Sequence, residues 1–389
     1  MKICFLVNSI FNLGGVQRVV SVLASSLVEK YDVEVVCLDD KYKENRDLYN
    51  LNEKVIVKFA PNIMNKSIHT KAFSKVIRAI NNNSKLMNSM IFCGAIKEAY
   101  YPREIQKRLL KYLHENNYDI VIANEGNLSI LLAIINDNFK GKAIGWQHSS
   151  YEAYFQTPKE YVWNQDSLFK KYLNRLDEYV VLTKHDKKMI EEKFDIECSQ
   201  IYNPLSFQSK IKSDVKNKRI ISAGRMHKNT KGYDLLIEAF SKIAKNHEDW
   251  VVDIIGEGED KEALQKMVFN KGLENQIKFL GFTNNMKDEY INSSIYVSAS
   301  RWEGFGLTII EAMECGVPVI AFENTGPSEI INNNINGILI ERENVDLLAK
   351  KLSELIENEE LRISLSNKAI ERAYDFSMYQ IRCRWEQLF

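Results

Sequence analysis

Short apolar runs alternate with helical stretches along the first part of the chain. Residues 2–8 have the pattern of a buried strand, residues 16–29 that of a helix and residues 33–38 that of a second strand, with two glycines in the first loop. Strand, glycine loop, helix and strand in this order form a βαβ unit, which predicts a parallel sheet with its ligand edge at the loop. Further apolar runs predict three more strands, at residues 120–123, 143–146 and 179–182.

The alternation restarts after a polar, lysine-rich stretch that begins at Asn203-Pro204 and ends at Lys218. We interpret this stretch as an interdomain linker. Beyond it, the pattern predicts strands at residues 219–223, 250–255, 277–279, 295–298 and 319–322, and helices at residues 233–245 and 261–271. The chain is therefore expected to form one α/β domain over residues 1–205 and a second over residues 206–374.

The C-terminal tail, residues 375–389, has the pattern of one more helix. Met378, Ile381, Trp385 and Leu388 are spaced so that their side chains share one helical face. This spacing predicts an amphipathic helix that packs on a domain surface.

Residues 62–111 do not follow the α/β rhythm. Ten basic residues stand here against Glu98 and Glu104 alone: Lys66, Lys71, Lys75, Arg78, Lys85, Lys97, Arg103, Lys107, Arg108 and Lys111. Within the segment, one predicted helical face is apolar and carries Phe73, Val76, Ile77 and Ile80. Two interpretations remain open: an ordinary surface helix with a solvated basic face, or a cationic surface for anionic lipid or a lipid-diphosphate acceptor.

Composition narrows the class of protein. The chain has 389 residues, enough for two sizeable cores, and 52 basic residues balance 52 acidic ones, so nothing global points to nucleic acid. Six scattered cysteines without a C-x-x-C pair indicate a reducing compartment and argue against structural zinc or disulfides. No secretory segment follows Met1, and no apolar run approaches the ~20 residues that span a bilayer. We expect a cytoplasmic protein, which the lipid interpretation of residues 62–111 would place at the inner face of the cell membrane.

The most informative motif runs from Glu303 through Gly304-Phe305-Gly306-Leu307 to Glu311. A glycine-broken loop enters a short helix, whose first N–H groups and dipole suit a phosphate, and Gly316 closes the helix. At about 1.5 Å of rise per residue, Glu311 lies some 6–8 Å from the anion site, the reach from a diphosphate to a ribose. The motif thus predicts a nucleotide-sugar site.

The spacing of the two glutamates resembles that of the retaining glycosyltransferases of family 4. Further elements of that family's pattern follow in order along the chain: Gly14-Gly15, Gly224-Arg225, Lys231-Gly232, Gly256-Glu257-Gly258 and Leu280-Gly281-Phe282. The resemblance covers most of the chain. It implies the GT-B fold, in which two Rossmann-like parallel-sheet domains face each other across a cleft, with the acceptor on the N-terminal domain and the nucleotide sugar on the C-terminal one. It also implies that the C-terminal helix crosses back onto the N-terminal domain.

Arg225 and Lys231 are candidate catalytic residues because two cations at the C-terminal edge of a sheet stabilise a leaving diphosphate. Glu311 is expected to accept hydrogen bonds from the ribose hydroxyls. The resemblance implies that Glu303 contacts the donor sugar near the reacting carbon. Because the two glutamates need not lie at the ~5–5.5 Å of a retaining glycosidase pair, we favour front-face substitution over a double displacement with Glu303 as nucleophile.

The remaining candidates line the two expected ligand edges. Gly14 and Gly15 would let the backbone approach a ligand, and Gly281 and Phe282 would border the base pocket. His148 follows a predicted strand, in a loop where the resembling family has a histidine that touches the donor sugar. A tight turn for the glycines, core filling for Phe282 and a structural role for His148 remain the alternatives.

The absence of an Asp-x-Asp pair predicts a site that requires no metal and no cofactor besides its nucleotide-sugar substrate. The predicted activity is transfer of a hexose or N-acetylhexosamine, carried by UDP, to a glycan or lipid-linked glycan of a surface polysaccharide or glycolipid. The sugar, the nucleobase and the acceptor hydroxyl stay open. The alternatives are a nucleotide-sugar epimerase on the same fold, which the glutamate motif disfavours, and a non-catalytic partner subunit, which would be expected to lose Arg225, Lys231 or Glu303.

Overall fold

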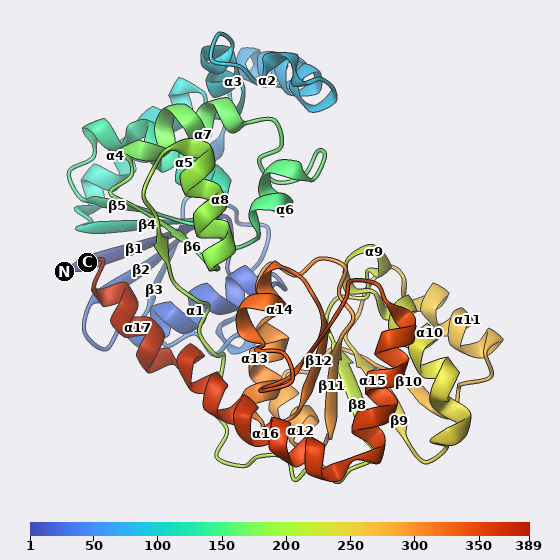
Figure 1. Ribbon diagram of the computed structural model, residues 1–389. Helices are drawn as coiled ribbons and strands as arrows, with labels where there is room; N and C mark the ends of the chain where they lie inside the picture. The colour runs from blue at the N-terminus through green and yellow to red at the C-terminus, as the bar shows by residue number, and fades with distance from the viewer. The chain divides into compact units, whose positions relative to one another are not determined.

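The computed structural model describes residues 1–389, apart from the side chains of Leu86 and Lys228 (Figure 1). The chain divides into two compact units, which are described separately below. Unit 1 consists of Met1–Pro204 and Ile381–Phe389, and unit 2 of Leu205–Gln380. None of the helices formed by the described residues is both long enough and apolar enough to cross a membrane.

Unit 1 contains a seven-stranded sheet in the order β3-β2-β1-β4-β5-β6-β7, and all of its strand pairs are parallel. The strands are β1 Lys2–Val7, β2 Asp32–Cys37, β3 Ile56–Phe59, β4 Ile120–Asn124, β5 Lys142–Trp146, β6 Glu178–Val181 and β7 Ser199–Gln200. The inner strands are buried along almost their whole length, as expected of a parallel sheet covered on both faces.

Eight α-helices of the described residues belong wholly to unit 1. They are α1 Gly15–Leu27, α2 Ile68–Asn83, α3 Cys93–Tyr100, α4 Arg103–Asn116, α5 Gly126–Ile135, α6 Tyr151–Gln156, α7 Asp166–Tyr172 and α8 Lys184–Phe194. Short 3-10 turns stand between them: η1 Arg46–Leu48, η2 Pro61–Met64, η3 Lys85–Met87, η4 Asn136–Asn138 and η5 Leu173–Arg175. The most apolar of these helices, α5, is buried over nearly its whole circumference, so it lies within the core of the unit.

Unit 2 contains a six-stranded parallel sheet in the order β10-β9-β8-β11-β12-β13. Its strands are β8 Arg219–Ala223, β9 Val251–Ile255, β10 Ile277–Leu280, β11 Ile295–Ser298, β12 Val319–Phe322 and β13 Ile338–Ile340. Its helices are α9 Lys228–Lys231, α10 Tyr233–Ile243, α11 Lys261–Asn270, α12 Met286–Ile291, α13 Leu307–Glu314, α14 Thr325–Ile330, α15 Val345–Glu357 and α16 Glu359–Ala373, with turns η6 Ala244–Asn246 and η7 Tyr374–Phe376.

The last helix, α17 Met378–Glu386, carries the chain from unit 2 into unit 1. Within unit 1, the Trp385 ring packs against that of Trp146 with 4.7 Å between ring centroids, and Ile381 is fully buried. The apolar spacing that predicted this helix therefore marks the side that is buried.

The predicted fold class, two Rossmann-like parallel-sheet domains, is confirmed. Every predicted strand is present, whereas the short strands β3, β7 and β13 were not predicted. All three lie at sheet edges, and β7 is only two residues long. Strands of only two or three residues, such as β7 and β13, carry too few alternating positions to give a pattern in the sequence.

The helix α2 differs from the expected pattern. Its inner side carries Ser74 and Asn81, both buried, while Phe73, Val76 and Ile80 of the predicted apolar face are exposed. Only Ile77 of that face packs against the core. The polar side turns inward because it is hydrogen-bonded: Arg78 donates to the carbonyls of Ala99 and Tyr100, and Asn81 to that of Asn164.

We predict that Gly232→Ala destabilises unit 2 by about 2–4 kcal/mol, because the added Cβ would combine left-handed strain with overpacking. Gly232 has φ +60°, and a Cβ there would stand 2.0 Å from the carbonyl oxygen of Ala299. Gly272→Ala is the matched control, since Gly272 has φ +65° but open space around its missing side chain. Urea unfolding of the two variants checks the difference, and equal losses of about 1 kcal/mol would contradict the steric account.

Candidate active site

The strand order of unit 2 places a switch point between β8 and β11. From β8 the chain builds β9 and β10 on one side, and it then returns to build β11, β12 and β13 on the other. Where the loops after two neighbouring strands run in opposite directions, a crevice opens at the carboxyl ends of the strands. Open α/β sheets bind their ligands in this crevice. Gly224 and Arg225 follow β8 at this edge, and Ser300 and Glu303 follow β11.

An ion pair joins the two sides of this crevice. The Lys231 ammonium lies 2.6 Å from Glu303 Oε2, and both side chains are partly buried. Ser300 Oγ donates to the same carboxylate oxygen at 3.4 Å. Lys231 and Glu303 are thus brought together by tertiary structure, although the sequence suggested separate contacts for them.

Close backbone packing shapes the loop after β8. Gly224 has φ +150°, and a Cβ on Gly256 would stand 2.1 Å from the Gly224 carbonyl oxygen, so these loops fit together only without side chains. The hydroxyl of Tyr233 lies next to Gly224 and is buried without a hydrogen-bond partner among the described residues. An unsatisfied buried hydroxyl is unfavourable, which makes it a candidate ligand contact.

The glycine-rich loop enters α13 as the motif predicts. Gly306 has φ +109° and caps the helix at its N-terminus, so the amides of Leu307 and Thr308 have no intrahelical acceptor, whereas those of Ile309 and Ile310 donate to the Gly306 carbonyl. Leu307 is the first helical residue, and Gly304 lies in the loop before it. Phe305, however, is buried with its ring against Phe376, so it can offer a ligand only its backbone.

Glu311 is not a surface glutamate, because only 1% of it is exposed. Its carboxylate accepts hydrogen bonds from Ser206 Oγ at 2.7 Å and from Tyr290 Oη at 3.3 Å. A ribose hydroxyl would have to share this carboxylate with protein donors, which the four lone-pair directions of a carboxylate allow.

The other predicted residues of unit 2 lie at the surface. Arg225 is exposed on the loop after β8, and Gly281 and Phe282 follow β10, with the Phe282 ring 48% exposed. Trp302, beside Glu303 in the chain, is covered on one face by the Arg342 guanidinium at 4.5 Å from the ring centroid. Phe282 therefore does not fill the core, and its ring face is available for stacking.

In unit 1, Gly14 and Gly15 stand at the start of α1. Gly14 has an extended backbone that any residue adopts, and a Cβ on it would meet only the Gln17 side chain. Its N–H donates to Tyr49 Oη at 2.8 Å. The structure thus gives no steric reason for a glycine at position 14.

His148 follows β5 and is held between two neighbours. Its ring packs against Trp146 at 4.2 Å, and its Nε2 lies 3.0 Å from Asn124 Oδ1. Asn124 Nδ2 donates to the carbonyls of Leu6 and Ile122, which turns the amide oxygen toward the histidine. The Nε2 atom of His148 therefore carries the proton, and Nδ1 is left as an acceptor.

Two polar residues of this edge were not predicted. Glu125, directly after β4, accepts a hydrogen bond from Asn8 Nδ2 at 2.9 Å, and Asn8 directly follows β1. Glu125 has φ +72°, and burial raises the pKa of its carboxyl group. The signal in the sequence was the polar pair Asn124-Glu125 after the apolar run of residues 120–123.

A possible metal-binding group, also not predicted, lies near the loop after β8. Ligand atoms of His227, Glu259 and Asp260 lie within 4.8 Å of one another, and His227 Nε2 is 3.1 Å from Glu259 Oε1. The carboxylate of Glu259 is largely exposed, and the pair forms an ion pair only when His227 is protonated. Its geometry is that of a surface contact.

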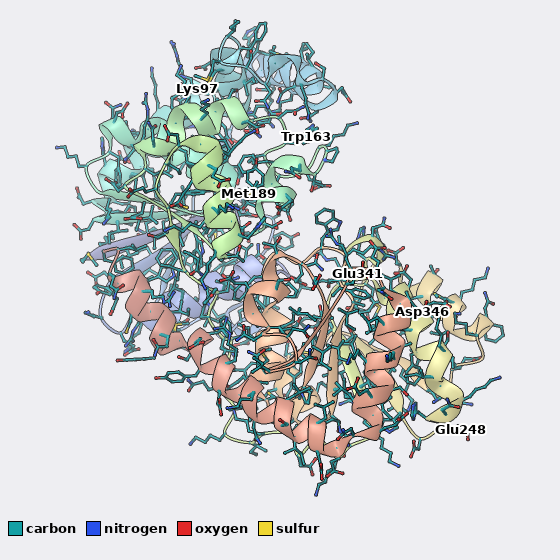
Figure 2. The ribbon with its side chains drawn as sticks, in the orientation of Figure 1. Lys97, Trp163, Met189, Glu248, Glu341 and Asp346 are labelled. Atoms are coloured by element: carbon teal, nitrogen blue, oxygen red, sulfur yellow. The ribbon has the colours of Figure 1, made fainter. Side chains whose placement is uncertain are left out.

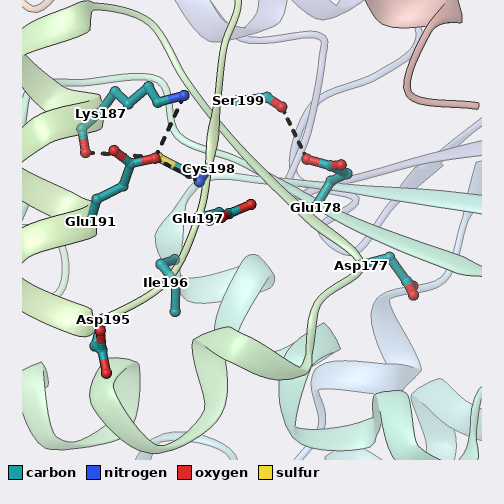
Figure 3. Close-up of a pocket in the computed structure, with 9 residues that line it drawn as sticks. All are labelled: Asp177, Glu178, Lys187, Glu191, Asp195, Ile196, Glu197, Cys198 and Ser199. Carbon is teal, nitrogen blue, oxygen red and sulfur yellow. Dashed lines mark hydrogen bonds and ion pairs between the residues drawn. The ribbon is translucent and has the colours of Figure 1, made fainter.

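The surface hollow in Figure 3 lies at the opposite, amino edge of the unit 1 sheet, where β6 and β7 begin. Its lining is acidic, with Asp177, Glu178, Glu191, Asp195 and Glu197 against Lys187. Internal bonds occupy part of this lining, among them Ser199 Oγ to Glu178 Oε2 at 3.0 Å. Carboxylates repel phosphates, so this hollow does not suit a nucleotide.

His148 provides a pH-dependent test of its burial. Desolvation lowers the pKa of the imidazole from 6.5 to about 3, so the folded protein holds the neutral form. This contribution to stability is complete above the unfolded pKa near 6.5 and is lost as the pH falls toward 3. Between pH 7 and pH 5, wild type should lose about 1–2 kcal/mol more unfolding free energy than His148→Asn, measured by urea titration of tryptophan fluorescence. Equal losses of unfolding free energy in wild type and His148→Asn would contradict the burial of the imidazole.

Comparison with known proteins adds to this geometry. Residues 206–372 match the family described as glycosyl transferases group 1. An uncharacterized glycosyltransferase of Haemophilus influenzae is 28% identical over 391 residues, which cover 99% of each chain. The poly(ribitol-phosphate) alpha-N-acetylglucosaminyltransferase of Staphylococcus aureus is 27% identical over 361 residues, which cover 90% of this chain and 73% of that one.

Among solved structures, Anabaena HepE in complex with UDP has a TM-score of 0.75 to this protein at 18% identity, over 100% of this chain and 99% of that one. The fold is thus that of the GT-B glycosyltransferases. Residues 206–372 thus match the group 1 glycosyl transferases, and the relatives that are similar over most of the chain are glycosyltransferases.

Proposed function

We propose that the protein transfers a sugar from a UDP-linked donor to a glycan or lipid-linked glycan acceptor, with retention of the anomeric configuration. The observation that carries this proposal is the Lys231–Glu303 pair at the switch point of unit 2, in the same unit as the first two amides of α13, those of Leu307 and Thr308. The likeness to HepE, whose structure contains UDP, favours uracil as the base.

In this proposal the diphosphate binds at the carboxyl ends of β8 and β11. Lys231 and Arg225 supply positive charge, the N-terminus of α13 supplies amides, and the Tyr233 hydroxyl gains an acceptor. These groups act most strongly when charge develops on the leaving diphosphate, so they stabilise the transition state more than the bound substrate. Phe282 stacks on the base, and Glu311 accepts from the ribose.

Glu303 binds the donor sugar because the ammonium that contacts the diphosphate also contacts this carboxylate. With the diphosphate beside Lys231, the sugar lies next to Glu303, which then accepts hydrogen bonds from the sugar hydroxyls. The bond from the anomeric carbon to the phosphate oxygen breaks, and the acceptor oxygen bonds to the same face of that carbon. The acceptor proton passes to the leaving phosphate.

The cations and the helix terminus together replace a metal ion in this proposal. Arg225 and Lys231 provide the charge that a divalent cation provides elsewhere, so chelators should not stop the reaction. The non-catalytic alternative predicts nucleotide or glycan binding without turnover, and the epimerase alternative predicts a changed sugar without an acceptor.

We expect UDP-sugars to stabilise the protein and to be hydrolysed slowly in EDTA, since water can replace the acceptor. Lys231→Met should lower turnover by about 10²–10³, because a preorganised cation is lost from the leaving group. Thermal shift and release of the nucleoside diphosphate from UDP-, GDP-, ADP- and dTDP-sugars measure both effects. Lys266→Met, at an exposed position on α11, is the matched control. Wild-type turnover in Lys231→Met would remove the leaving-group role, and absence of binding to every nucleotide would favour the partner-subunit alternative.

We propose further that α2 and the turn before α3 lie on an anionic membrane, which places the enzyme at the cytoplasmic membrane face. Figure 1 shows α2 and α3 next to each other at one end of unit 1, and Lys97 of α3 and Trp163 are labelled at this end in Figure 2. The exposed apolar side chains here are Ile68, Phe73, Val76, Ile80, Met90, Ile91 and Phe92, with Val76 58% and Ile91 87% exposed.

The charge of this region matches an anionic surface. Lys71 and Lys75 are exposed on α2, and Arg103 and Lys107 are exposed on α4. Exposed apolar groups beside lysines are typical of helices that lie in the membrane interface. A solvated surface helix, the alternative from the sequence, would not hold its polar residues inward and its apolar residues outward.

Sedimentation with phosphatidylglycerol vesicles tests this surface. Val76→Glu with Ile80→Glu should abolish most binding, and Lys71→Gln with Lys75→Gln should weaken it about 10- to 30-fold, since each lysine near such a surface contributes about 1 kcal/mol. Ile363→Glu is the control, because Ile363 is an exposed isoleucine on α16. Unchanged binding in both α2 variants, or equal binding to neutral phosphatidylcholine vesicles, would contradict the assignment.

A further inference from the structure

The sheet of unit 1 has a switch point of its own. From β1 the chain builds β2 and β3 on one side, and it later builds β4 to β7 on the other. β1 and β4 pair in parallel, with Leu6 opposite Ala123, so their carboxyl ends are adjacent. The first residues beyond these ends are Asn8 and Glu125, and the two loops diverge there. A crevice at this position is where an α/β sheet binds a ligand.

The side chains at this crevice offer hydrogen-bond acceptors. The Glu125 carboxylate receives a single donor among the described contacts, Asn8 Nδ2, and Nδ1 of the nearby His148 is unprotonated. Acceptors recognise hydroxyl donors, and a carboxylate repels a phosphate. The crevice therefore suits the uncharged polyhydroxyl part of a substrate and not its diphosphate.

The chain holds Glu125 in an unfavourable conformation. Its φ of +72° and ψ of 154° are rarely adopted by residues other than glycine. The Glu125 N–H donates to the Trp146 carbonyl, and the Ser129 N–H and Oγ donate to the Glu125 carbonyl. On the adjacent residue, the Gly126 N–H donates to Tyr154 Oη, which also receives the His148 N–H at 3.5 Å. The backbone of residue 125 is thus fixed by hydrogen bonds to β5 and α5, and the carboxylate lies at the end of β1 through its hydrogen bond with Asn8.

We infer that Asn8 and Glu125 form the subsite for the acceptor glycan, with the Glu125 carboxylate accepting a hydrogen bond from an acceptor hydroxyl. This inference rests on the proposed glycosyl transfer and names the residues that hold its second substrate. Burial raises the pKa of the Glu125 carboxyl, and no cation faces it from β1, β4 or β5 among the described contacts, so the carboxylate is a strong acceptor when ionised.

The test separates the acceptor from the donor. Glu125→Gln replaces one acceptor oxygen by a donor at constant size, so kcat/KM for the acceptor should fall about 10- to 100-fold. Octyl glucoside and octyl N-acetylglucosaminide serve as acceptor probes. The affinity for UDP and the slow hydrolysis of the donor should stay unchanged. Glu152→Gln, a carboxylate of α6 that is paired with His185, is the matched control.

A second variant distinguishes binding from a structural role. Glycine adopts the backbone angles of residue 125 without strain, so Glu125→Gly should keep or raise the melting temperature while acceptor transfer falls. A loss of stability in parallel with activity would overturn the inference, and so would wild-type transfer in Glu125→Gln or weakened UDP binding.

Failure of the glycosyl-transfer proposal gives a different result, since the wild type would then either not bind UDP or bind it without transferring a sugar from any UDP-sugar. In that case, saturation-transfer NMR of the octyl glycosides with wild type and with Glu125→Gln tests the acceptor subsite independently of any transfer activity. Glycoside binding that Glu125→Gln abolishes supports the subsite. Equal binding to both proteins, or binding to neither, overturns it.

Discussion

Parallel strand pairing is the constraint on which both candidate sites depend. It directs the carboxyl ends of all strands in a sheet to one edge, and the crossover helices cover the two faces. Each sheet reverses its order once, between β1 and β4 in unit 1 and between β8 and β11 in unit 2. Only at that reversal do the loops after neighbouring strands run in opposite directions, which leaves a crevice between them. Polar side chains that directly follow the two strands can meet at the base of this crevice.

The same arrangement appears in both units with opposite chemistry. In unit 2, a lysine from the β8 side meets a glutamate from the β11 side, and exposed Arg225 adds a second cation. In unit 1, a neutral asparagine meets Glu125, beside a histidine that burial keeps uncharged. The cationic crevice of unit 2 suits the charged part of a nucleotide sugar, and the crevice of unit 1, rich in hydrogen-bond acceptors, suits hydroxyl groups. Glycosyl transfer requires one site of each kind.

Much of this could be predicted from the sequence because the signal is local. The apolar runs located the main strands, and the motif from Glu303 to Glu311 located the loop, the helix and the closing glycine Gly316, whose φ is +75°. Local signals do not show how the neighbours of a residue place its side chain and backbone. Phe305 has the appearance of a loop residue that faces a ligand, but its ring is buried against Phe376, and Gly14 has an extended backbone that does not require glycine.

The sequence by itself thus determined the two parallel sheets, the order of their elements and the residues that follow the strands of unit 2, since hydrophobic period and glycine position are properties of short segments. Tertiary structure alone decided which polar groups meet. Asn8 and Glu125 are separated by 117 positions, and Lys231 and Glu303 by 72. It also decided that α2 holds Asn81 inward and leaves Val76 exposed, because buried carbonyl groups outside the helix accept the amide and guanidinium donors of its polar side. Contacts across such distances depend on strand order and packing, which no pattern within a single segment encodes.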